Sequence, residues 1–144
     1  MSTDRIMTPF EVQIAAADTN NEIRAAEIQL RKQVRDWFSA AKPSVFKQIN
    51  NELITQTVAN TSPIVVRTVV KSYPTKIYYL EPIGKMGYEA AEKTIKEEST
   101  TQCNLIGDFI KAQCHNLVNT TANFDRDYGL MDIQCQFTFG SIQK

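Results

Sequence analysis

The sequence predicts an α+β fold in which a small antiparallel sheet packs against amphipathic helices. Three patterns support it: a helical apolar stripe near the N-terminus, a hairpin over residues 64–80, and strict apolar–polar alternation over 131–139. The hairpin and the C-terminal strand would form the sheet, against N-terminal and central helices. A chain of 144 residues is the usual size of one domain. We therefore expect a single domain over residues 1–144, with an N-terminal helical segment at about 8–59.

The first helix is expected to begin at a capping box, in which the side chains of Thr8 and Glu11 accept hydrogen bonds from each other's backbone amides. Residues 18–21 are polar and either interrupt this helix or cap a second one. Apolar residues then recur at steps of three and four. They are Ile23, Ala26, Leu30, Val34, Trp37 and Ala41. Pro43 should end the helix, because the residue before a proline avoids the helical backbone conformation.

Pro43 also suits the first turn of a second helix, whose apolar side runs from Val45 to Val58. Residues 64–71 are rich in β-branched side chains and predict a strand. A turn at 72–75 would lead into a returning strand at 77–80.

The next helical pattern runs from Met86 to about Asn119, and residues 99–101 leave open whether it is one helix or two. Residues 123–129 then predict a polar turn, in which Gly129 supplies an unusual backbone angle. The final strand places one set of side chains on the core and the other in water. The core set is Met131, Ile133, Cys135, Phe137 and Phe139.

The net charge does not favour a nucleic acid or an anionic membrane as a partner, because 16 basic and 16 acidic residues balance. The polar N-terminus has no signal-peptide pattern, and no stretch approaches the ~20 apolar residues of a membrane span. We expect an intracellular protein, cytoplasmic or within a virion and not secreted. Three cysteines, an odd number, then favour reduced thiols that pack as small core residues.

No pattern predicts a cofactor or a metal. Cys114 and His115 are adjacent, and neighbours on a helix point ~100° apart, so the imidazole is badly placed as a base for the thiol. Residues 123–134 lack the glycine and the glutamate of a calcium loop at the required positions. The glycines at 84 and 87 lack the spacing of a phosphate-binding loop.

Two groups of residues are candidates for binding. On the hairpin, basic and aromatic side chains alternate, as in surfaces that bind single-stranded nucleic acid, and Arg67 and Lys71 would share a face. This set is Arg67, Lys71, Tyr73, Lys76 and Tyr78. The same residues also suit a charged strand edge that resists aggregation. On the first helix, either Trp37 or Phe38 would extend the core face and the other would anchor a partner, unless both belong to one wide core stripe.

The expected function is therefore a non-enzymatic structural or protein-interaction role, as a homo- or hetero-oligomeric subunit of a larger assembly such as a virus particle. Two alternatives stay open. One is a single-stranded nucleic-acid-binding module that uses the 64–80 hairpin. The other is a small enzyme whose site is assembled across several elements.

Overall fold

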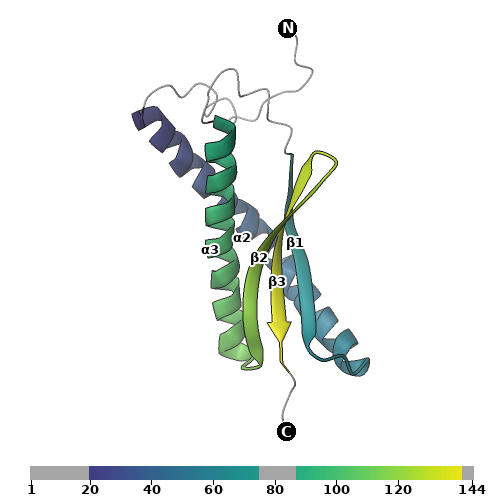
Figure 1. The fold of residues 1–144 in the computed structure, drawn as a ribbon. Coiled ribbons are helices and arrows are strands. Elements are labelled where there is room, and N and C mark those ends of the chain that lie inside the picture. The colour runs from purple at the N-terminus through teal and green to yellow at the C-terminus, as the bar shows by residue number, and fades with distance from the viewer. Residues whose placement is uncertain (1–19, 75–86, 141–144) are drawn as a thin grey trace.

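The computed structural model describes residues 20–74 and 87–140, which form two helices and one three-stranded sheet (Figure 1). The order along the chain is helix α2, strand β1, helix α3, strand β2 and strand β3. Their bounds are Asn20–Val58, Ile64–Pro74, Gly87–Gln113, Leu117–Asp127 and Leu130–Phe139. The predicted α+β fold is confirmed: the sheet is antiparallel and packs against both helices.

The sheet has the order β1-β3-β2, so the last strand of the chain lies in its centre. The apolar side chains of β3, from Met131 to Phe139, are at most 1% exposed and face the helices. Helix α2 packs mainly on β1 and helix α3 on β2, and the two helices also contact each other. This central strand fulfils the predicted alternation because one of its faces is covered and the other is not.

Helix α2 runs without a break through Pro43, so the predicted helix boundary at Lys42-Pro43 is wrong. A proline inside a helix costs about 3 kcal/mol, because it removes one hydrogen bond and crowds the preceding turn. On either side of it Phe38 and Val45 are buried in the core. Burial of each such side chain contributes roughly 1.5–3 kcal/mol, which is enough to offset the proline. The predicted capping box at Thr8 and Glu11 lies outside the described residues.

Helix α3 is one continuous helix that ends at Gln113, earlier than the predicted Asn119. Residues 117–127, expected as a helix end and a turn, form strand β2 instead. This segment is rich in Asn and Thr, which are weak helix formers, and it pairs along its length with β3. The turn that joins β2 to β3 consists of Tyr128 and Gly129, with φ angles of 46° and 82°. Two positive φ angles are typical of a type I′ hairpin turn, and the prediction for Gly129 is confirmed.

Strand β1 continues to Pro74, through most of the predicted turn, and pairs with β3. The predicted returning strand at 77–80 lies outside the described residues. At the outer edge of β1 the side-chain amide of Gln56 acts as a substitute strand. Its Nε2 donates to the Val65 carbonyl (2.9 Å), and its Oε1 accepts from the Val65 amide (3.3 Å).

A disulfide joins Cys103 of α3 to Cys135 of β3, with their Cα atoms 5.6 Å apart. Both residues are completely buried. The expectation of three reduced cysteines is therefore wrong for this pair, and Cys114 is the free one. Periodicity placed each of the two on a core-facing side, but it carries no information about which residues of two faces meet. That depends on how α3 is positioned along the sheet.

Candidate interaction surfaces

The two aromatic residues predicted to bind a partner both pack within the chain. Phe38 is 1% exposed and belongs to the core. Trp37 is half-buried, its ring centroid 5.6 Å from that of Tyr73, and Lys71 Nζ lies 5.3 Å from the centroid of the indole. Trp37 is thus engaged by an aromatic and a cationic neighbour of β1.

The predicted nucleic-acid surface is not assembled as expected. A bulge in β1 between Val69 and Lys71 shifts the alternation by one residue, which moves later side chains to the opposite face. Arg67 pairs with Gln136 on the open face of the sheet, whereas Lys71 pairs with Ile133 on the helix-covered face. The prediction that Arg67 and Lys71 share a face is therefore wrong.

Of the other residues in that set, Tyr73 is 4% exposed and contributes to the core. Lys76 and Tyr78 lie outside the described residues. Arg67 Nε donates to Gln136 Oε1 at 2.8 Å, within a polar network that covers the open face. Asn123 donates to the same oxygen (3.0 Å). These polar groups satisfy one another across the strands.

A charged cluster joins the two helices near the N-terminal half of α2. Glu98, whose side chain is 8% exposed, accepts from Arg35 (3.3 Å) and Gln102 (3.0 Å) and pairs with Arg31 (3.5 Å). Arg31 also contacts Glu97 at 3.0 Å. The nearly buried carboxylate of Glu98 thus has two cationic partners and an amide donor, which compensate for its lost hydration, so this cluster has a structural role.

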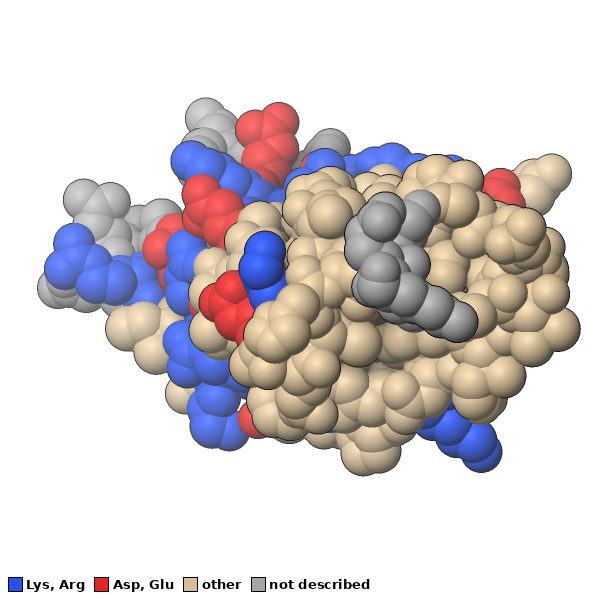
Figure 2. All heavy atoms as spheres, turned by 90° about the horizontal axis from the view of Figure 1, so that it is seen from below, with Lys and Arg blue, Asp and Glu red and all other residues tan. Residues whose placement is uncertain are grey.

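Within residues 20–74 and 87–140, three segments without charged side chains meet at one end of the structure. Segments 53–66, 112–124 and 133–140 contain no Asp, Glu, Lys or Arg. They meet because α2 and α3 end, and β1 and β2 begin, where β3 also ends (Figure 1). Figure 2 shows from this end a broad area without acidic or basic side chains, with most of the charged side chains to its left and a few at its upper and lower edges. We call the described surface of these three segments the uncharged end.

Three aliphatic side chains are largely exposed at the uncharged end. Ile54 is 65% exposed, Val58 82% and Val118 64%. Around them lie small polar residues, including Asn60 and Thr61. Protein interfaces are distinguished less by overall apolarity than by the depletion of charged residues at their centre, and this end has that composition.

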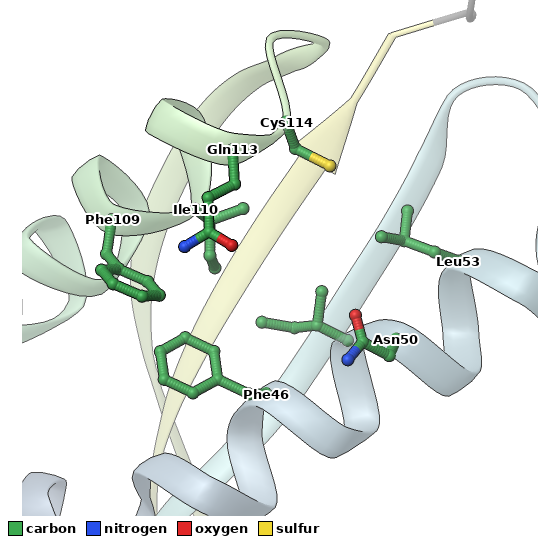
Figure 3. A pocket seen from close by; sticks show the side chains of 8 residues that line it. Phe46, Asn50, Leu53, Phe109, Ile110, Gln113 and Cys114 are labelled. Atoms are coloured by element: carbon green, nitrogen blue, oxygen red, sulfur yellow. The ribbon is translucent and has the colours of Figure 1, made fainter.

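An apolar groove of about 150 Å³ lies between the C-terminal halves of α2 and α3 (Figure 3). The rings of Phe46 and Phe109 lie together at one end of it, with centroids 5.3 Å apart. The amides of Asn50 and Gln113 lie between the helices. Its other apolar walls are Ile49, Leu53, Ile110 and the Cys114 thiol.

The size of the groove decides what it fits. Typical small-molecule sites have volumes of roughly 300–1,000 Å³. An apolar cavity of about 150 Å³ is known to hold benzene. The groove therefore matches a single aromatic side chain better than a metabolite. Within the described ranges, no cluster of three or more His, Cys, Asp or Glu side chains has a geometry suited to a metal.

The sequence contained a signal for the uncharged end, namely three runs without charge, but their convergence depends on the fold. The groove had no such signal, because its walls come from helices far apart in sequence. Comparison with protein families, with characterised proteins and with solved structures finds no match to this chain. In the part of the chain that the structure describes, neither helix has an apolar stretch that could span a membrane.

Proposed function

We propose that this protein is a non-enzymatic subunit of a larger protein assembly and that the uncharged end is its contact surface. The observation that carries this proposal is the absence of charged side chains from three converging segments. A buried charge without a partner is costly, so a surface without charges can be covered by a neighbour without that penalty. Exposed Ile54, Val58 and Val118 supply apolar area for the contact.

The partner that fits this end is another protein surface that is itself poor in charge. A charged partner surface would lose hydration without gaining ion pairs in return. Of the two expected locations, the cytoplasm and a virion, the buried Cys103–Cys135 disulfide favours the virion, because disulfides persist in oxidising settings such as the surface of a virus particle.

The test places carboxylates at two exposed aliphatic positions of the uncharged end. The double variant Val58→Asp, Val118→Asp is compared with Ile28→Asp, because Ile28 is an exposed aliphatic residue (61%, against 64% for Val118) outside the three segments. Each tagged protein is cross-linked in its native cell with a reagent whose photo-activated carbene inserts into any side chain, because the three segments contain no Lys, Asp or Glu. Cross-linked residues are identified by mass spectrometry. Circular dichroism of each purified variant checks that the fold is retained.

We expect the wild type and Ile28→Asp to give the same cross-links, with sites concentrated in the three uncharged segments. The double variant should lose these cross-links at least about tenfold, since buried charges at an interface centre cost several kcal/mol. Cross-links spread evenly over the surface, or an unchanged pattern in the folded double variant, would rule out this end as the contact surface.

A further inference from the structure

The exposed aromatic residue of the β2–β3 turn has features of a binding element. Tyr128 is 97% exposed at the tip of the two-residue turn. The turn is held by two long paired strands, and Arg126 forms an ion pair with Glu92 of α3 beside it. The ring is therefore presented on a rigid support, which lowers the entropy lost when a partner orders it.

The backbone at Tyr128 is unfavourable for this residue type. Its φ angle of 46° lies in the left-handed region, where a bulky side chain is an outlier. Asn or Gly is the usual residue at this position of a type I′ turn. Since the tyrosine makes the turn less stable and reaches only solvent within the chain, its ring points to a function outside the chain.

We propose that Tyr128 of one copy of this chain inserts into the groove between α2 and α3 of a second copy. The groove volume of about 150 Å³ matches one aromatic ring. Phe46 and Phe109 provide aromatic walls against which the ring packs edge-to-face or offset. The amides of Asn50 and Gln113 lie between the helices as partners for the tyrosine hydroxyl.

Charge around the two surfaces is complementary. Within four residues of Tyr128 lie three carboxylates, Asp125, Asp127 and Asp132. The one cation there, Arg126, is paired with Glu92. The turn therefore carries net negative charge near the ring; we call Asp125, Asp127 and Asp132 the acidic collar.

Neither Lys42 nor Lys47 lines the groove, but along α2 exposed Lys42 lies one turn before Phe46 and exposed Lys47 directly follows it. The nearby carboxylate of α2, Glu52, lines a different pocket beside β1, away from the groove. Likewise Asp108 and Lys111 of α3 line a pocket on the β2 side. The groove thus has a basic rim on α2 that suits the acidic collar of the turn.

The arrangement of the two surfaces determines the type of assembly. The turn lies at one end of the sheet, and the C-terminal parts of α2 and α3, which line the groove, lie toward the other end (Figure 1). A contact between unlike surfaces of identical subunits is head-to-tail and repeats into rings or filaments. This inference rests on the proposed role as an assembly subunit. The groove shares Leu53, Gln113 and Cys114 with the segments of the uncharged end, but it does not include Val58 or Val118.

The test uses two variants that each remove one side of the contact. Tyr128→Asn removes the ring and places a residue suited to the turn. Phe109→Glu removes an aromatic wall of the groove and repels the acidic collar. Sedimentation velocity of the full chain over a concentration series should show open-ended association of the wild type. Each variant alone should raise the dissociation constant at least about 30-fold, as for loss of an interface hot spot.

Mixing the variants gives the sharpest result. Tyr128→Asn retains its groove and Phe109→Glu retains its ring, so an equimolar mixture should form one-to-one dimers that do not extend. Tyr128→Phe should associate within about threefold of the wild type, since a net hydrogen bond of the hydroxyl contributes little. Leu105→Glu is the matched groove control, because Leu105 is as exposed as Phe109 (54% and 55%) but does not line the groove.

Three outcomes would overturn the inference. They are a wild type that stays monomeric at millimolar concentration, association that is unchanged in Tyr128→Asn, and a mixture that behaves as the sum of its parts. The double variant at Val58 and Val118 separates the two proposals. Association that survives Tyr128→Asn but is lost in that variant supports the uncharged end and refutes the Tyr128 contact. The reverse pattern supports the Tyr128 contact alone.

Discussion

The disulfide between α3 and β3 should supply a large part of the stability of this protein. Cys103 and Cys135 are separated by 32 positions. The loop-entropy relation gives about 3.7 kcal/mol of stabilisation for a closed loop of this length. Domains of this size have a total free energy of unfolding of about 5–15 kcal/mol, so the link contributes a substantial fraction. The variant Cys103→Ala, Cys135→Ala is the corresponding perturbation.

Urea denaturation followed by circular dichroism measures the effect. The double variant should unfold with a free energy lower by about 3–4 kcal/mol, and with a steeper dependence on urea, because its unfolded chain exposes more surface. Cys114→Ala is the control, since Cys114 is free and half-buried, and it should change the free energy of unfolding much less. Thiol titration of the denatured wild type without reductant should detect one thiol.

The reasoning would be refuted by three reactive thiols in the denatured, unreduced wild type. It would also be refuted if the double variant and the wild type unfolded with equal free energies, both measured without reductant. A wild type whose free energy of unfolding is insensitive to prior reduction in denaturant would lead to the same conclusion.

Other single changes test the packing of the helices. Glu98→Gln should lower the free energy of unfolding by about 1–3 kcal/mol, because the nearly buried carboxylate pairs with arginine. Glu97→Gln should change it by less than about 1 kcal/mol, because the ion pair of Glu97 is half-exposed. Urea titration of both variants measures the difference. Gly107→Ala should lower the free energy of unfolding by about 1–2 kcal/mol, measured by thermal unfolding, because the added Cβ would lie 2.9 Å from the Cβ of Thr120. This overpacking outweighs the gain in helix propensity. Equal or higher stability of the variant would contradict this contact. Pro43→Ala should raise the free energy of unfolding by about 1–3 kcal/mol, and a loss of stability would show that the proline is needed in α2.

The strand β3 shows which structural features a sequence pattern can predict. Its alternation from Met131 to Phe139 predicted the element and its buried face, because a strand with one covered side requires a period of two. Of the stripe predicted for α2, Ala26, Leu30 and Val34 are buried, as the period of a helix requires, whereas the stripe continues through Phe38 and not through the predicted Trp37. Both patterns depend only on local geometry and on the presence of some core.

Only the tertiary structure decided the features that join distant segments. Helix α2 continues through Pro43 because packing on the sheet outweighs a local penalty, and residues 117–127 become a strand because β3 offers a partner. The bulge in β1 moved Lys71 to the helix side, which no local pattern signalled. The Cys103–Cys135 link depends on how α3 is positioned along the sheet.

The sequence by itself determined the α+β class, the central amphipathic elements and the distribution of charge along the chain. The fold decided where these properties lie in space. It gathered three uncharged runs at one end, built the groove from two helices and set Tyr128 at the tip of the hairpin near the other end. The physical reason is that periodicity fixes which side of an element is buried, whereas contacts between elements fix what each side meets.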